Sequence, residues 1–519
     1  MSASCPKSTL GFKSPLRVVA WFLLRSRDLK AEKCRRLKRE LDTSKRLLSQ
    51  RELELERATG KLLQLRREIR QLLSRQRIAR ERQFTLPTDP PLKSHGYGAR
   101  MVCLAVELAQ IVGFRATERV LKVVFEWFGV KQKLPSFTTI RHWVQRLGVA
   151  ALNESIEEAD DWVWLADHSN QIGAEKVMAV LAIRSSELPS LGHAIKHEDV
   201  HVLTVQPGET WKKENVADVY QQLAQRYGAP RAVLMDGAAE LREGAEILKK
   251  QRSDTVTLQD FKHKAANLFK ALIGKNARFI EFNTQLGKTR SAIQQTELAH
   301  LTPPSLKQKA RFMNLGRQLE WASVVLTLLK HPEARCQQWI TPKRLEDKLG
   351  WLRGFADDLA VWYECQQVIH TGLKLINEQG LSRGTAKDLR LAIGKLKHHL
   401  SQKLAEQLIA FVAEAEECLK EGERLPLSTE ILESSFALYK QLERQHSKGG
   451  FTSLLASFAA LLRKPTPELI RRSFAAVSTK DVKLWVQQNL GTTLNAKRMI
   501  TYREMKQLEK NVTISVALT

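Results

Sequence analysis

The spacing of apolar residues along the chain changes near residue 84 and again near residue 161. Residues 28–83 contain no proline, and five apolar residues recur there at intervals of seven: Leu41, Leu48, Leu55, Leu62 and Ile69. A heptad spacing of this kind is typical of a coiled coil. The second apolar column of the heptad is imperfect because it includes Ser44 and Arg51. The pattern therefore predicts one long helix, which is either a dimerising, DNA-touching arm or a solvated charged helix.

Residues 84–96 contain several prolines and predict a linker, which three shorter helical patterns follow at Arg100–Val112, Thr117–Phe128 and Phe137–Leu147. Ser136 is well placed to cap the third helix. The apolar face of that helix leaves six polar or basic residues that we expect to face outward: Thr138, Thr139, Arg141, His142, Gln145 and Arg146. Such a face suits a recognition helix in a DNA major groove. The preceding loop is long for a helix-turn-helix, so a small helical bundle that links two domains is the alternative.

From residue 161 the apolar residues form short runs that predict five strands: Trp162–Asp167, Lys176–Ile183, His201–Val205, Arg231–Asp236 and Thr255–Leu258. Helical patterns at Asn215–Tyr227 and Ala239–Lys250 separate the later strands. The resulting order β-β-β-α-β-α-β predicts an α/β domain. Beyond it, residues 263–424 are almost wholly helical in pattern, and Glu430–Arg444 predicts one more helix.

Composition argues against a membrane-spanning or secreted protein. The chain has 519 residues, of which 43% are hydrophobic, so it can form a sizeable core. The early apolar run Val18–Leu24 is too short to span a bilayer, and no cleavage site for a secretory signal follows it. The six cysteines are scattered without a C-x-x-C pair, which indicates reduced thiols. We therefore expect a cytoplasmic protein, nucleoid-associated if the chain is bacterial, with no membrane partner.

The net charge of +27 indicates a polyanionic partner, and its distribution says more. Residues 1–152 carry 32 Lys and Arg against 13 Asp and Glu, a net charge of +19. Residues 153–260 carry 11 against 19, a net charge of −8, and residues 261–519 carry 40 against 24, a net charge of +16. Basic flanks thus enclose an acidic middle, where a carboxylate cluster could hold divalent cations.

Three carboxylates are candidates for such a cluster. Asp167 ends the first predicted strand, Asp236 ends the fourth, and Glu433 lies near the start of the helix Glu430–Arg444. Strand ends place side chains at the rim of an α/β sheet. Two Mg²⁺ or Mn²⁺ ions held by oxygen ligands can activate an attacking water or 3′-hydroxyl and stabilise the leaving oxygen in phosphodiester chemistry.

These segments resemble the RNase H-like catalytic domain of DDE transposases, in which the acids come from the first strand, the fourth strand and a late helix. Asp167 in WVWLADHSNQIG, Asp236 in AVLMDGAAEL and Glu433 in ILESSFALYK match the three acids. The element Asp260-Phe-Lys-His263 is similar to the D-x-x-H element of hAT and related superfamilies. The resemblance implies catalytic, metal-binding roles for the three acids and supporting roles beside the metals for Asp260 and His263. Glu430, on the same helix face as Glu433, is an alternative third acid, and His263 is alternatively a core or helix-start histidine.

The resemblance also implies a domain plan: an α/β RNase H-like core that an all-α insertion interrupts, preceded by a basic helical arm and a helix-turn-helix-like region. The expected boundaries are 1–83 for the arm, 84–152 for the DNA-binding region, 153–263 for the first part of the core, 264–425 for the insertion, 426–445 for the catalytic helix and 446–519 for a C-terminal helical region. No zinc-binding BED finger precedes the core, so the organisation looks closer to a bacterial insertion-sequence transposase.

The expected function is DNA transposition by a homodimer or higher oligomer that cuts element ends and joins them to target DNA. A transposase-derived DNA-binding regulator without catalysis, or an RNase H-type nuclease that does not join strands, is the alternative. Four tryptophans of the insertion are expected in its core, although one could instead stack on a flipped base: Trp321, Trp339, Trp351 and Trp362.

Overall fold

A computed structural model describes residues 16–81, 89–93, 95–172, 175–208, 210–251, 254–305, 315–331, 340–445, 453–491 and 494–517. The chain divides into two compact units, Met1–Thr88 and Asp89–Thr519. The finer domain boundaries expected from the sequence remain predictions.

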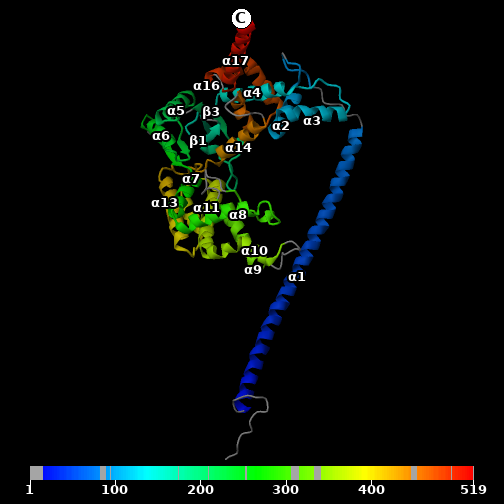
Figure 1. Cartoon of the computed structure of the whole chain (residues 1–519), viewed down its shortest axis with the longest axis vertical. Coiled ribbons are helices and arrows are strands. Elements are labelled where there is room, and N and C mark those ends of the chain that lie inside the picture. The colour runs from blue at the N-terminus through cyan, green and yellow to red at the C-terminus, as the bar shows by residue number, and fades with distance from the viewer. Residues whose placement is uncertain are drawn as a thin grey trace, which may run out of the picture. The chain divides into compact units, whose positions relative to one another are not determined.

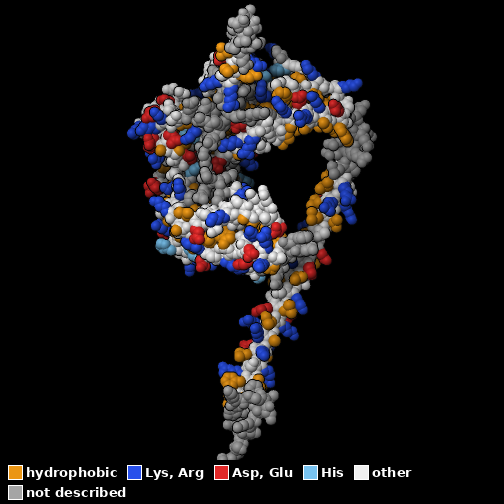
Figure 2. Space-filling model, in the orientation of Figure 1, with side chains coloured by type: hydrophobic (Ala, Val, Ile, Leu, Met, Phe, Trp, Pro, Cys, Tyr) orange, Lys and Arg blue, Asp and Glu red, His pale blue; other side chains and the backbone are white. Residues whose placement is uncertain are grey.

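The first unit contains the long helix that the heptad spacing predicts. Helix α1 (Leu16–Glu81) is unbroken and begins ahead of the expected residue 28 (Figure 1). The five heptad residues are between 53% and 69% exposed. Figure 2 shows hydrophobic and basic side chains interspersed along the helix. The helix is thus confirmed, and its pairing stays a prediction.

The second unit is built on a five-stranded mixed sheet with the order β3-β2-β1-β4-β5. Its strands are β1 (Trp162–Ile172), β2 (Glu175–Arg184), β3 (His201–Gly208), β4 (Ala232–Met235) and β5 (Val256–Gln259). Strands β1, β2 and β3 pair antiparallel, while β4 lies parallel to both β1 and β5. The predicted order of strands and helices is confirmed, and the core is α/β with additional helices.

Alternation along β1 gives the sheet two apolar faces. Trp164 and Ala166 pack into the cluster beneath α5 (Lys213–Tyr227) and α6 (Ala239–Gln251), which cover one face (Figure 1). Val163 and Leu165 point the other way, into a larger core that the remaining helices share. Asp167 follows in the alternation of that second face, where β1 meets α14 (Glu430–Arg444). The first predicted acid therefore lies on the side of the sheet that α14 covers.

The described residues between β5 and α14 are largely helical, as predicted. Its helices are α7 (Phe261–Ile273), α8 (Ala277–Ile293), α9 (Gly316–Lys330), α10 (Pro342–Leu349), α11 (Ala356–Gln379), α12 (Thr385–Ile393) and α13 (His399–Glu416). Trp351 and Trp362 both lie against the ring of Phe282, as core tryptophans do. Trp339 lies outside the described residues.

Helices from the two ends of the second unit pack together. They are α2 (Ala99–Val112), α3 (Phe114–Trp127), α4 (Phe137–Asn153), the 3₁₀ segment η6 (Ser453–Leu462), α15 (Pro467–Ala476) and α16 (Thr479–Leu490), and α17 (Leu494–Ala517) follows them. Ser136 caps α4 as predicted, because its hydroxyl accepts a hydrogen bond from the Thr139 N–H at 3.3 Å. Gly148 of α4 lies so close to the backbone of Ala456 that a side chain there would clash with it. Helix α4 is therefore central to a helical bundle.

This central position corrects part of the expected DNA-binding face. Gln145 and Arg146 are 2% and 4% exposed, so the expectation that they face outward is wrong. The amide of Gln145 donates to the Ser453 carbonyl at 2.7 Å. The guanidinium of Arg146 donates to two carbonyls of the C-terminal helices and lies over the ring of Phe474. Both side chains hold the bundle together instead of facing a partner.

Among the described residues, no helix is both long and apolar enough to cross a membrane. The described residues include four cysteines, all of them free thiols: Cys34, Cys103, Cys365 and Cys418.

Candidate functional site

Three aspartates form one row across the carboxyl edge of the sheet. Ala166 of β1 pairs in register with Met235 of β4, which in turn pairs with Gln259 of β5. The next residue on each strand is an aspartate: Asp167, Asp236 and Asp260. Because neighbouring parallel strands lie about 4.8 Å apart, this register brings the predicted pair Asp167 and Asp236 side by side.

Asp260, the third in the row, connects two distant parts of the chain. Its Oδ1 accepts hydrogen bonds from the backbone N–H of His263 at 2.7 Å and from the His263 ring at 2.8 Å, which caps α7. Its Oδ2 accepts from the backbone N–H of Thr429 at 2.6 Å and from the Thr429 hydroxyl at 3.1 Å. Asp260 is completely buried, and both of its oxygens are used. It therefore anchors the start of α14, and with it Glu433, beside the sheet.

The buried position of the first acid has a strong electrostatic effect. Asp167 is 7% exposed, and burial, together with the negative charge of Asp236, raises its pKa to about 8. Burial also raises the pKa of Asp236. Glu433 contributes to the rise at Asp167, so the three predicted acids act on a common region. Carboxylates that repel one another in a buried place are stabilised by a cation between them.

His263 supplies one positive charge at this place. Burial alone would lower its pKa, but the hydrogen bond and charge of Asp260 and the charges of Asp236 and Asp167 raise it to about 9. The ring of His263 is therefore protonated near neutral pH, and it faces the predicted acids. His168, the neighbour of Asp167, lies on the opposite face of the sheet, 3.6 Å from Glu240 of α6.

Lys262 supplies the second positive charge. Its ammonium lies 2.9 Å from Glu430 Oε1 and 2.9 Å from Glu433 Oε2, bridging two carboxylates that are one helical turn apart on α14. The other oxygen of Glu430 accepts a hydrogen bond from the Asn377 amide at 2.6 Å. The other oxygen of Glu433, Oε1, is buried and has no hydrogen-bond partner among the described residues.

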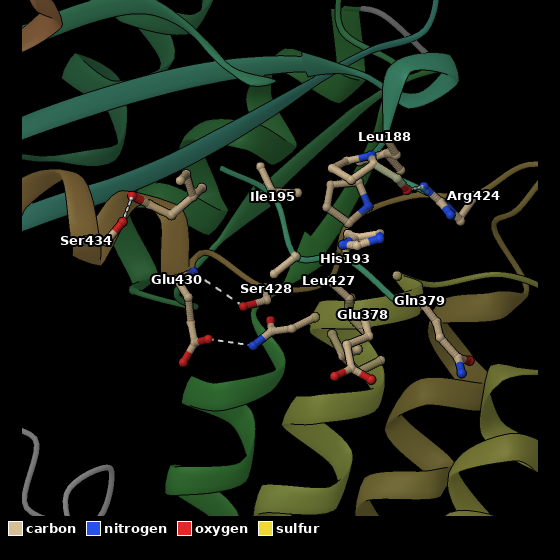
Figure 3. Close-up of a pocket in the computed structure, with 17 residues that line it drawn as sticks. Leu188, His193, Ile195, Glu378, Gln379, Arg424, Leu427, Ser428, Glu430 and Ser434 are labelled. Carbon is tan, nitrogen blue, oxygen red and sulfur yellow. Dashed lines mark hydrogen bonds between the residues drawn. The ribbon is translucent and has the colours of Figure 1, made fainter. Parts of the chain in front are cut away.

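The two glutamates therefore differ in their surroundings. Glu430 lines a pocket of about 220 Å³, formed with residues of the loop after β2 and the end of α11 (Figure 3). In Figure 3 the Glu430 carboxylate points to the amide at the end of α11, and its backbone N–H lies against Ser428. Glu433 does not line that pocket. The unpaired oxygen of Glu433 and its influence on Asp167 favour it over Glu430 as the third acid.

The donor set suits a hard divalent cation, because Asp167, Asp236 and Glu433 offer carboxylate oxygens and one of these is buried without a partner. The three do not form a closed set of ligands as they stand. Among the described residues, no group of three or more His, Cys, Asp and Glu side chains is arranged to hold a metal ion. Glu433 is instead engaged by the ammonium of Lys262.

The remaining predicted DNA-binding residues lie at the amino-terminal half of α4. Thr138, Thr139 and Arg141 are half-buried, and His142 is exposed. Nothing in their described surroundings identifies a ligand.

Comparison with known proteins gives little more. The chain matches no protein-family model and no curated protein. Among solved structures, it is similar to the strand transfer complex of the Drosophila P element transposase. The match has 12% sequence identity and a TM-score of 0.35, and it covers 79% of this chain and 98% of that one.

Sequence reasoning missed Lys262, Asn377 and Thr429. Lys262 stands within the Asp260-Phe-Lys-His263 element, which was a signal of proximity to the site. Its partner Glu433 lies 171 residues away, and no local pattern connects the two.

Proposed function

We propose that this chain is a DDE-type DNA transposase, with an RNase H-like core, that cuts the ends of a mobile element and joins them to target DNA. One observation carries the proposal. Asp167 and Asp236 are adjacent in a row at the carboxyl edge of a sheet ordered β3-β2-β1-β4-β5, and α14 brings a carboxylate with an unpaired buried oxygen to the same region.

The order and direction of the strands support the finer assignment. Three antiparallel strands followed by two parallel ones, with the third acid on a helix after a helical insertion, is the arrangement that the resemblance to DDE transposases implies. Asp167, Asp236 and Glu433 are the residues that would hold two Mg²⁺ or Mn²⁺ ions. Such ions, when bound, activate the attacking oxygen and stabilise the leaving oxygen of a phosphodiester.

The chain's own residues prepare this site in three ways. Asp260 fixes the start of α14 against α7, which determines where Glu433 lies. Burial, together with the charge of Asp236, raises the pKa of Asp167, and a bound cation would offset both effects. The protonated ring of His263, oriented by Asp260, offers a positive charge to the same carboxylates and to a phosphate that approaches them.

The rest of the molecule fits DNA as the partner. The chain carries a net charge of +27, and the basic flanks supply the excess. Residues 1–152, including the exposed basic helix α1, would bind element ends and pair two copies into a homodimer or higher oligomer. We assign the chain to the bacterial insertion-sequence type, and this assignment depends on the domain order alone.

The test uses the full chain, Mg²⁺ and labelled duplexes taken from the DNA that flanks the coding region. Asp236→Asn removes one charge of the adjacent pair and should lower strand cleavage by at least about 10³-fold while sparing DNA binding. Asp254→Asn, an exposed aspartate before β5, is the matched control and should leave both unchanged. Gel assays of cleavage and of strand transfer, with a separate binding assay, give the three measurements.

The outcomes separate the candidate functions. Loss of binding together with cleavage, or full cleavage by Asp236→Asn, would contradict the assignment of the acids. Cleavage without joining would favour the nuclease, and binding without metal-dependent cleavage by the wild-type chain would favour the regulator.

A further inference from the structure

The ammonium of Lys262 occupies the place beside Glu433 that a cation would need. Its Nζ lies 2.9 Å from one oxygen of Glu433 and 2.9 Å from one oxygen of Glu430. The Lys262 side chain is only 19% exposed, so these contacts are partly shielded from water. An interaction between charges is stronger in such a place than at the open surface.

The two carboxylates are not equivalent partners for this lysine. Glu430 is also held by the Asn377 amide through its second oxygen, a contact that involves neither Lys262 nor Glu433. Glu433 has a second oxygen that is buried and unpaired among the described residues. A lysine that gives up Glu433 thus keeps a fixed carboxylate in Glu430, and Glu433 gains a complete carboxylate for another cation.

We infer that Lys262 is a displaceable internal cation, which holds Glu433 in the metal-free protein, yields it to a divalent cation and retains Glu430 as its own partner. The inference rests on the metal site of the proposed function. Lys262 is accordingly a positioning residue. Glu430 binds the ammonium of Lys262 and is not a ligand of the metal. The long flexible stem of lysine suits this role, because its ammonium can move between two acceptors without movement of the backbone.

The test measures Mn²⁺ binding to the full chain by electron paramagnetic resonance of the free ion, which needs neither DNA nor activity. Lys262→Met removes the competing charge and should tighten Mn²⁺ binding at least about fivefold. Glu430→Gln removes the partner that releases the lysine from Glu433, so it should weaken Mn²⁺ binding by a similar factor. Lys262→Arg keeps the charge and should bind Mn²⁺ much as the wild type does.

Two controls separate this mechanism from a general effect of charge. Lys264→Met removes the same charge two residues along α7, where the ammonium lies over the ring of Phe411, and should change binding less than Lys262→Met. In a Lys262→Met background, Glu430→Gln should have almost no effect, because Glu430 acts through the lysine. Circular dichroism checks that each variant folds, and Lys262→Gln replaces Lys262→Met if the latter does not.

Several results would overturn the inference. Weaker Mn²⁺ binding by Lys262→Met, or an undiminished effect of Glu430→Gln in the double variant, would show that the lysine does not compete with the cation. Both of these leave the metal site intact as long as Asp167→Asn abolishes binding. Absence of Mn²⁺ binding by the wild type and by Lys262→Met alike would instead refute the metal site, and the inference with it.

Discussion

At the scale of single residues, Asp260 is completely buried and yet fully hydrogen-bonded. A carboxylate that is fully buried is costly unless its oxygens are satisfied, and Asp260 accepts four hydrogen bonds from two residues. Burial alone would raise its pKa, but the hydrogen bond and charge of His263 and the backbone donors outweigh burial and lower it. His263 responds in the opposite direction, because the same contacts raise its pKa to about 9.

This pair predicts a pH dependence of stability in metal-free protein. The contribution of His263 is fully present below its unfolded pKa of 6.5 and disappears as the pH rises through about 9. The contribution of Asp260 is present above its unfolded pKa of 3.8 and disappears as the pH falls through its lowered folded value. Relative to wild type, His263→Gln should therefore lower the free energy of unfolding by about 3 kcal/mol near pH 5.5, and the difference should shrink towards pH 10.

Urea unfolding of both proteins in a chelating buffer measures that difference across the pH range. An Asp260→Asn background provides the control, because most of the pH-dependent difference should disappear without the carboxylate. A difference that stays constant from pH 5.5 to 10 would mean that the ring of His263 is neutral in the folded protein.

At the scale of elements, α1 presents a stripe of exposed apolar residues at heptad spacing. Leu55 stands in the heptad column and is 69% exposed, whereas Leu53 is 49% exposed and lies outside that column. A helix of 66 residues with such a stripe gains stability by pairing, because the exposed leucines then leave water.

The matched pair of leucines makes the pairing testable. Leu55→Glu places a charge in the stripe and should raise the dissociation constant for self-association at least about tenfold, since a charge in the seam is poorly tolerated. Leu53→Glu introduces the same charge on another face and should change it little. Sedimentation equilibrium of the full chains measures both, and equal effects of the two substitutions would contradict a heptad seam.

Helices and strands are the features that the sequence predicts well. The five strands and α14 follow from local patterns, because each carries its own apolar periodicity and its own turn signals. The burial of Gln145 and Arg146 does not follow from such a pattern. The carbonyls that receive their hydrogen bonds belong to residues 308 to 331 positions further along, so a polar helix face was mistaken for an outward one.

The same distinction applies to the site. Asp167 and Asp236 are predictable because each follows an apolar run, and neighbouring parallel strands bring such positions together. The expectation that Asp167 ends its strand is wrong, since β1 continues to Ile172 in its pairing with β2. The alternative between Glu430 and Glu433 could not be decided from the sequence, since both lie on one face of one helix. Lys262 contacts both glutamates, whereas Asn377 binds Glu430, and both partners come from helices that only the tertiary packing brings to α14.

At the scale of the whole molecule, the charge distribution predicts how binding responds to salt. A protein that neutralises six to ten phosphates binds roughly 10³- to 10⁵-fold more weakly at about 200 mM salt than at about 50 mM. The net charge of +27 makes a decrease of this size the expected result for this chain. Fluorescence anisotropy with a labelled duplex at several salt concentrations measures the slope.

The exposed arginines of α1 refine that prediction. The triple substitution R66A/R67A/R70A should reduce the slope of log affinity against log salt by up to about 3, because each arginine that neutralises a phosphate contributes about one unit. An unchanged slope would mean that α1 does not bind the DNA backbone and that the charge of the other flank carries the binding.

The hydrogen bonds between Asp260 and Thr429 have a consequence for synthesis of the protein. The two residues are 169 positions apart, so at ribosomal rates of about 5–20 residues per second the second follows the first by roughly 10–30 s. During that interval the nascent chain already holds Asp167 and Asp236 but has neither the carboxylate of Glu433 nor the Thr429 donors that satisfy Asp260. Under the proposed function, an unfinished or truncated chain is therefore unable to cut, which would protect the DNA of the cell from polypeptides that the ribosome has not completed.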